Sequence, residues 1–340
     1  MKFLFVTSLA LVLHASFCVQ VAFSAVPSPA VAQDSAAAPA SVQIPLPTWS
    51  SSQAQHVYGF PDLKPHKKGS LTLSADELVF SGKSGTSAIR RSAIRSVSAG
   101  NQRVELWGIG GRVLRSAIPD GGGIAAAAVM HHRVDMLTIE FVDGRGGNHG
   151  AVFLLPAHEA DRALDSFALA PVPAQRPSNA VCANAAVEPN SVLVTIPAWD
   201  QAEVPAAYRT LVYEHVIARL RAAKGVGHVY SDGEVNSESA CPQYIIHLAV
   251  KAFQEGSSVK RAAFGPVGFF VGTTHIAFDV TYTDASGKLH LSEEIKATIR
   301  GESESTNIAD HVAKTLAKRY RSLLKNNPET HPTHAANSVS

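Results

Sequence analysis

The sequence predicts an α+β protein with two folded domains. Short segments of alternating apolar and polar residues indicate strands with one buried face, and three longer segments carry apolar residues at the three- and four-residue steps of amphipathic helices. A proline-rich break at 171–189 separates these segments and predicts a linker. The predicted domains are a small β-barrel with a C-terminal helix at 59–170, and a domain at 190–326 made of a strand, a helix, antiparallel strands and a helix.

The first 32 residues have the layout of a cleavable signal peptide. Lys2 precedes an apolar stretch that reaches Phe23, and Ala30 and Ala32 supply the small residues that a cleavage site requires. We expect cleavage after Ala32, with a second candidate site at Ser24. The protein is therefore predicted to be exported, periplasmic or extracellular, and soluble after signal cleavage.

Two alternatives for this leader stay open. An uncleaved apolar segment of about 20 residues would be long enough to anchor the chain in a membrane. Cys18 would allow a lipid anchor, but Phe17 occupies the position where lipoprotein signals need a small residue.

The net charge of +2, from 30 basic and 28 acidic residues, favours neither nucleic acid nor an anionic membrane as a partner. Local basic clusters occur at 64–68 and at Arg90, Arg91 and Arg95, and we interpret them as solvated faces.

Two cysteines remain after the leader is removed, Cys182 and Cys241. An even pair in an oxidising compartment predicts a disulfide, which would contribute on the order of 4 kcal/mol by closing a loop of about 60 residues. The alternative is a pair of buried free thiols.

The first domain begins after a segment at 33–58 that is rich in Ala, Ser, Pro and Gln, and that we predict to be a disordered lead. Alternating residues at 69–73 and 77–80 then predict a hairpin. Strands at 136–142 and 151–155 flank a glycine-rich turn.

A helix at 157–169 ends this domain, with Ala160, Leu164 and Phe167 at helical spacing. The segments 69–73, 78–80 and 94–97 resemble the opening of bacterial pleckstrin-homology-like (PH-like) and GRAM-like domains, and the terminal helix fits that resemblance. It implies a PH-like β-barrel and a binding role, since such domains bind lipids, peptides or other proteins.

The second domain opens with an apolar strand at 192–196 and a helix at 205–224. Strands follow at 244–250, 276–282 and 289–299. A closing helix begins at a capping pair formed by Asn307 and Asp310, and it turns one apolar side inward: Ile308, Val312, Leu316, Tyr320 and Leu324. The tail at 327–340 is predicted to be disordered.

This domain resembles uncharacterised exported bacterial domains, many of them from lipoproteins, and distantly the curli-secretion lipoprotein. The resemblance rests on the glycine-punctuated segment 264–268, the strand ending at Tyr282, the turn at 284–287 and the closing helix. It implies an envelope protein of unknown function.

The sequence contains no recognisable catalytic, cofactor or metal motif. His131 and His132 lie near Asp135, but adjacent strand residues point to opposite faces and no third ligand follows, so we expect no metal site and no cofactor. His247 and His275 are predicted to be ordinary strand residues.

A glycine- and alanine-rich stretch is the candidate ligand-contact loop, and the alternative is a flexible connector or a short buried helix. Its candidate residues are Gly121, Gly122, Gly123, Ile124, Met130 and His131. The resulting hypothesis is a non-enzymatic binding or scaffold protein with an envelope protein or lipid as partner. The alternatives are an envelope hydrolase with a site between the domains, and a lipid-binding protein that acts through the PH-like domain.

Overall fold

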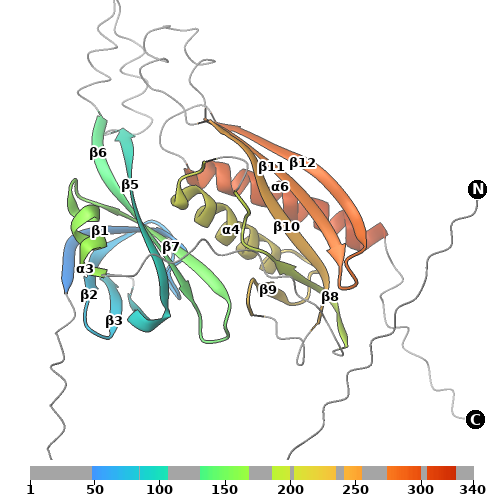
Figure 1. The fold of residues 1–340 in the computed structure, drawn as a ribbon, viewed down its shortest axis with the longest axis horizontal. Coiled ribbons are helices and arrows are strands. Elements are labelled where there is room, and N and C mark those ends of the chain that lie inside the picture. Colours follow the sequence, from blue (N-terminus) through green and yellow to red (C-terminus); the bar gives the residue numbers. More distant parts are fainter. Residues whose placement is uncertain are drawn as a thin grey trace, which may run out of the picture. The chain divides into compact units, whose positions relative to one another are not determined.

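The computed structural model describes residues 48–83, 85–105, 131–167, 186–199, 203–234, 241–254, 274–299 and 305–326. All of them fall within one compact unit, Pro45–Ser340. They form two β-sheets, three α-helices and a short 3-10 helix, which confirms the predicted α+β class (Figure 1). No helix in these ranges combines the length and the apolarity that crossing a membrane requires.

The first sheet has seven antiparallel strands in the order β4-β3-β2-β1-β7-β6-β5. Its elements are β1 (Trp49–Tyr58), β2 (Lys67–Leu73), β3 (Glu77–Gly82), β4 (Gly85–Arg90), η1 (Arg91–Ala93), β5 (Ile94–Glu105), β6 (His131–Val142), β7 (Asn148–Leu155) and α3 (Glu159–Phe167). The chain passes from β4 to β5 through η1 without pairing them, so both are edge strands. The predicted closed barrel is not found: the described strands form an open sheet with β4 and β5 at its edges.

The two predicted hairpins of this sheet are confirmed. Leu71 on β2 pairs with Phe80 on β3, and Leu137 on β6 pairs with Phe153 on β7. All four side chains are fully buried in one hydrophobic cluster. Alternation of apolar and polar residues therefore identified the buried face correctly.

Strand β1 corrects the prediction of a disordered lead at 33–58, because residues 49–58 pair with both β2 and β7. Its buried positions include Ser51, Ala54 and His56, which are polar or small and give no apolar alternation. His56 is fully buried yet satisfied: Phe60 N–H donates to its Nε2 at 3.0 Å, and its Nδ1 lies 3.2 Å from the Lys64 carbonyl oxygen. The rest of the lead lies outside the described residues.

Helix α3 differs from its prediction at Leu164, which is 39% exposed, whereas Ala160, Ala163 and Phe167 are buried. Asp135 Oδ2 accepts a hydrogen bond from Ala160 N–H at 3.1 Å, so this buried carboxylate caps the first turn of the helix.

Arg91 fixes the other end of α3 and corrects its assignment to a solvated face. The side chain is buried, and its guanidinium donates to the Ser74 carbonyl at 2.9 Å and to the Ser166 and Phe167 carbonyls at 2.9 and 3.1 Å. The last two acceptors are C-terminal carbonyls of the helix, which have no partner within the helix itself.

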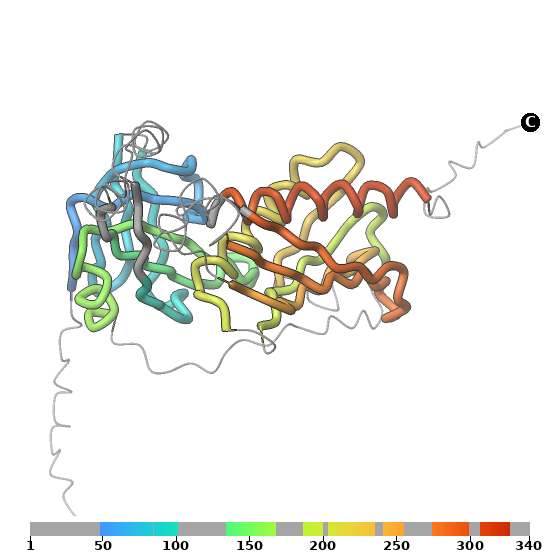
Figure 2. The backbone as a smooth tube through the Cα atoms, turned by 90° about the horizontal axis from the view of Figure 1, so that it is seen from above, coloured from blue at the N-terminus to red at the C-terminus, as the bar shows by residue number. Residues whose placement is uncertain are grey.

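The second sheet has the order β12-β11-β10-β8-β9, with β8 parallel to both neighbours and the other pairs antiparallel. Its elements are β8 (Val187–Val194), α4 (Ala206–Arg221), β9 (Val229–Ser231), β10 (Cys241–Gln254), β11 (Thr274–Asp284), β12 (Leu289–Ile299) and α6 (Ser305–Asn326). The predicted alternation along β11 is confirmed, since Ile276, Phe278, Val280 and Tyr282 are buried beneath the helices. Figure 2 shows α6, in red, running alongside the strands of this sheet.

The start of α6 corrects the predicted capping pair. The helix already includes Ser305, and Asp310 instead lies beside two cations, Arg219 of α4, whose Nε donates to it at 2.8 Å, and Lys314, whose Nζ is 2.8 Å away. Ile308, Val312, Leu316 and Tyr320 are buried as predicted.

Helix α4 is buried nearly all round, rather than along one stripe. Its buried residues include Leu211, Val212, Val216 and Leu220, but also Glu214 on another side. One hydrophobic cluster joins α4, α6 and the second sheet to Val57, Met136 and Val152 of the first sheet. Residues on both sides of the predicted linker therefore share a core. Of the linker itself, the structure describes residues 186–189, which include the first residues of β8.

Candidate functional site

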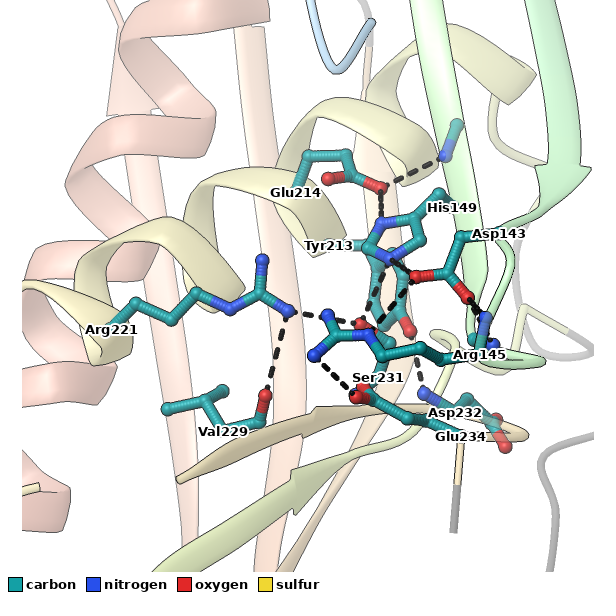
Figure 3. A network of polar contacts seen from close by, with 12 residues as sticks. Asp143, Arg145, His149, Tyr213, Glu214, Arg221, Val229, Ser231, Asp232 and Glu234 are labelled. Carbon is teal, nitrogen blue, oxygen red and sulfur yellow. Dashed lines mark hydrogen bonds and ion pairs between the residues drawn. The ribbon is translucent and has the colours of Figure 1, made fainter. Parts of the chain in front are cut away.

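Polar side chains from three segments, one of them α4, form a cluster (Figure 3). The segments are the β6–β7 turn (residues 143–147) with the start of β7, the middle of α4, and the post-β9 turn (residues 231–234). Two of these segments are turns that carry glycines at positive φ, Gly146 and Gly233. A β-carbon on Gly233 would lie 2.8 Å from the Gly146 carbonyl oxygen, so the close approach of the two turns requires glycine.

His149 is at the centre of this cluster and its side chain is only 12% exposed. Its Nδ1 lies 3.1 Å from Glu214 Oε1 on α4, and its Nε2 lies 3.2 Å from Ser231 Oγ. The same Nε2 is 3.6 Å from Asp143 Oδ2. Both imidazole nitrogens therefore face oxygen acceptors.

Glu214 joins α4 to β7 through two donors. Its Oε1 accepts from Gly150 N–H at 2.9 Å as well as from the His149 imidazole. Burial by itself lowers the pKa of His149, but the hydrogen bond and charge of Glu214 and the charge of Asp143 outweigh burial and the opposing charge of Arg221. The net result is a raised pKa for His149.

The β6–β7 turn is held by its own aspartate and by the post-β9 turn. Asp143 Oδ1 accepts from Arg145 N–H and Gly147 N–H, each at 2.8 Å. Asn148 N–H donates to the Asp232 carbonyl at 2.7 Å, and Arg145 forms an ion pair of 3.2 Å with Glu234.

Ser231, His149 and Glu214 stand in the order of a nucleophile, a base and an acid, which is the arrangement of hydrolytic triads. Ser231, however, is fully buried. Its N–H donates to Glu234 Oε2 at 2.9 Å, and Arg221 Nη2 approaches its hydroxyl at 3.5 Å. The geometry thus matches a triad, but the serine is enclosed by structural partners.

Tyr213 and Asp232 are the remaining two residues of the cluster, and they contact each other. Asp232 N–H donates to the Tyr213 hydroxyl at 2.8 Å, and Asp232 Oδ2 accepts from Ile196 N–H at 2.9 Å. Burial raises the pKa of Tyr213 well above its ordinary value, and the charge of Glu214 acts in the same direction. Tyr213 is therefore a neutral hydroxyl that anchors the post-β9 turn.

The sequence-predicted site residues that the structure describes, His131 and Cys241, are not part of this cluster. His131 begins β6, and the remaining candidate loop residues, Gly121 to Met130, lie outside the described residues. Asp135 caps α3, and the described ranges contain no group of three or more residues placed to hold a metal. Cys241 is buried at the start of β10 and Cys182 lies outside the described residues, so their pairing stays a prediction.

The sequence prediction missed the cluster because its contacts join distant residues. His149 and Glu214 are 65 positions apart, and His149 and Ser231 are 82 apart. The available signal was a pair of polar glycine turns, Asp143-Gly144-Arg145-Gly146-Gly147 and Ser231-Asp232-Gly233-Glu234. Such turns are common in surface loops, so they did not indicate a shared site.

No family model and no curated protein matches this chain. Solved structures that match part of it include a PelC dodecamer from Paraburkholderia phytofirmans, at 18% identity and a TM-score of 0.27, covering 37% of this chain and 84% of that one. A single-residue variant of the same dodecamer matches at 18% identity and a TM-score of 0.27, covering 42% and 94%.

Proposed function

We propose that this protein is an exported, non-enzymatic binding or scaffold protein of the cell envelope. The observation that supports this most is the burial of Ser231, because the strongest catalytic arrangement in the described residues has its hydroxyl fully enclosed. A nucleophile must reach its substrate to act. The cluster then acts as a brace that joins β7, α4 and the post-β9 turn.

The second sheet offers a surface that suits a binding role. The face of β10, β11 and β12 turned away from the helices carries paired charges: Lys251 Nζ lies 3.6 Å from Asp279 and 3.3 Å from Glu294, and Lys296 Nζ lies 2.9 Å from Glu294. Hydrogen bonds to Glu294 raise the pKa of Lys251, and those from Lys296 and Lys251 lower the pKa of Glu294. These charged side chains are partly or largely exposed, so a partner could contact them.

Three expectations from the sequence support the proposal. The leader directs export, and in the oxidising compartment beyond the membrane Cys182 and Cys241 would pair as a disulfide. The seven-strand order followed by α3 fits the proposed PH-like relationship, in spite of the open sheet. Members of such families bind proteins, peptides or lipids, and we propose an envelope protein as the partner.

The test is site-specific cross-linking in intact cells. A photoreactive residue at Ser292, on the exposed face of β12, should give a discrete larger species, and the same residue at fully buried Leu316 should give none. Only monomer from both positions, together with turnover by the purified chain, would reverse the proposal.

A hydrolase is the second candidate, and the row Ser231–His149–Glu214 favours it. In that reaction Ser231 Oγ attacks a carbonyl carbon while His149 Nε2 takes the serine proton, the carbonyl π electrons move to its oxygen, and Glu214 holds the resulting imidazolium. The imidazolium then gives its proton to the leaving group as the bond to that group breaks, and water hydrolyses the acyl-serine by the same steps. A fluorophosphonate probe that labels the wild type but not Ser231→Ala or His149→Gln would establish it. Equal, background labelling of all three chains would exclude it.

A further inference from the structure

The β6–β7 turn and the start of β7 contact α4 and the post-β9 turn through polar groups, and His149 lies at the centre of these contacts. Two of the contacts are made by backbone N–H groups, from Asn148 to the Asp232 carbonyl and from Gly150 to Glu214, and the others run through the side chains of His149, Asp143 and Arg145. The two turns have no large apolar side chain between them, since Gly146 and Gly147 face Gly233 and Ser231. Their association therefore relies on polar contacts.

Two carboxylates lie directly beside His149, Asp143 of the β6–β7 turn and Glu214 of α4. The post-β9 turn adds Asp232, whose Oδ2 accepts from Ile196 N–H, and Glu234, which pairs with other cations. The cations are Arg145 on the turn, which pairs with Glu234, and Arg221 on α4, which reaches the Ser231 hydroxyl; His228 also lies 3.6 Å from Glu234. A proton on His149 supplies the positive charge that Glu214 and Asp143 face directly.

We propose that the β6–β7 turn is a pH-dependent latch, held against α4 and the post-β9 turn while His149 carries a proton and loosened when that proton leaves. In the charged state Nδ1–H donates to Glu214, and Nε2–H faces Ser231 Oγ and Asp143 Oδ2. In the neutral state one nitrogen loses its hydrogen, and Asp143 and Glu214 face each other across an uncharged ring.

The direction of the pH effect follows from the raised pKa of His149. A histidine whose pKa is higher in the closed state stabilises that state fully below the pKa of the open state, about 6.5 for a free imidazole. The contribution disappears as the pH rises through the pKa of the closed state. The latch therefore closes in mildly acidic conditions and loosens toward alkaline pH.

Amide hydrogen exchange on the full mature chain tests this. Protection factors of the Asn148 and Gly150 amides, corrected for the intrinsic pH dependence of exchange, should fall between pH 6 and pH 9, by about tenfold for each unit by which closure raises the pKa of His149. In His149→Gln the protection should be low and independent of pH. His290→Gln is the matched control, because its imidazole pairs with Asp284 at 2.8 Å on the second sheet, and it should keep the wild-type profile.

Glu214→Gln keeps the proposal testable if His149→Gln fails to fold. The amide oxygen can still accept from Gly150 N–H, but the charge that favours protonated His149 is gone, so the pH dependence should shrink. A wild-type profile that is flat between pH 6 and pH 9, or one that His149→Gln and Glu214→Gln both retain, would overturn the latch.

Discussion

The imidazole of His149 and the carboxylate of Glu214 meet at 3.1 Å, and the same carboxylate oxygen accepts the N–H of Gly150. This contact joins the first strand after the β6–β7 turn to the middle of α4. Glu214 thus satisfies a backbone donor and an imidazole in a buried place, where each would be costly without a partner.

Replacing Glu214 by Gln should lower the pKa of His149. The hydrogen bond and charge of Glu214 are the main causes that raise this pKa, so without that carboxylate only Asp143 raises the pKa against burial and Arg221. An NMR titration of the His149 ring protons measures the change. The pKa of His247, which burial lowers, should stay the same, and a His149 pKa unaffected by the substitution would contradict this electrostatic account.

His56 predicts a loss of stability in acid. Burial lowers its pKa, and its Nε2 accepts the Phe60 N–H, so the folded state needs the neutral ring. A histidine with a lowered pKa gives stability that is present above the pKa of the unfolded chain, about 6.5, and is lost as the pH falls below it. Urea unfolding at pH 8 and pH 5 should show that His56→Gln loses less stability in acid than the wild type does; an equal loss in both chains would remove His56 as the cause.

Asp135→Ala should lower the free energy of unfolding by about 1 kcal/mol, because it removes the side-chain cap of α3. Asp165→Ala is the matched control, since this exposed aspartate lies in the last turn of the same helix, where an acid is unfavourable. Thermal denaturation of both variants, with and without EDTA, gives the comparison. An effect of EDTA that Asp135→Ala abolishes would point to a metal instead of a cap.

Arg91→Lys should lower the free energy of unfolding by about 2 to 3 kcal/mol, although the positive charge is retained. One ammonium group cannot reach the Ser74, Ser166 and Phe167 carbonyls together, and buried acceptors without donors are costly. Arg90→Lys, at an exposed position, should change stability by less than about 0.5 kcal/mol. Similar losses for the two variants in urea titrations would contradict the role given to Arg91.

The elements that the sequence predicted well are those with a regular apolar period. Strand β11 and helix α6 follow the two-residue and helical periods closely, because each buries one face and exposes the other. Strand β1 was missed because two of its buried residues, Ser51 and His56, are polar, and a prediction from apolar periodicity expects apolar residues at buried positions. His56 tolerates this place only through the Phe60 and Lys64 backbone, a pairing that emerges in three dimensions.

The two-sided burial of α4 could not be predicted for a related reason. Its apolar residues at three- and four-residue steps indicate one buried stripe, which is the side against α6 and the second sheet. The opposite side carries Thr210, Glu214 and His215, which are polar residues buried against the first sheet. Tyr58 of β1 stacks on His215 with ring centroids 3.9 Å apart, and Glu214 reaches β7. Polar residues of this kind are normally read as a solvent face.

The direct packing of β7 on α4 underlies both the brace and the latch, and Gly150 and Thr210 are the residues at which it is closest. A β-carbon on Gly150 would lie 2.5 Å from Thr210 Cγ2, so Gly150→Ala should cost about 1 to 3 kcal/mol by overpacking. In a double-mutant cycle measured by urea unfolding, the same substitution should cost less than about 0.5 kcal/mol in a Thr210→Ala background, where the space is open. An equal cost of Gly150→Ala in both backgrounds would mean that the two residues do not touch, and would contradict the account.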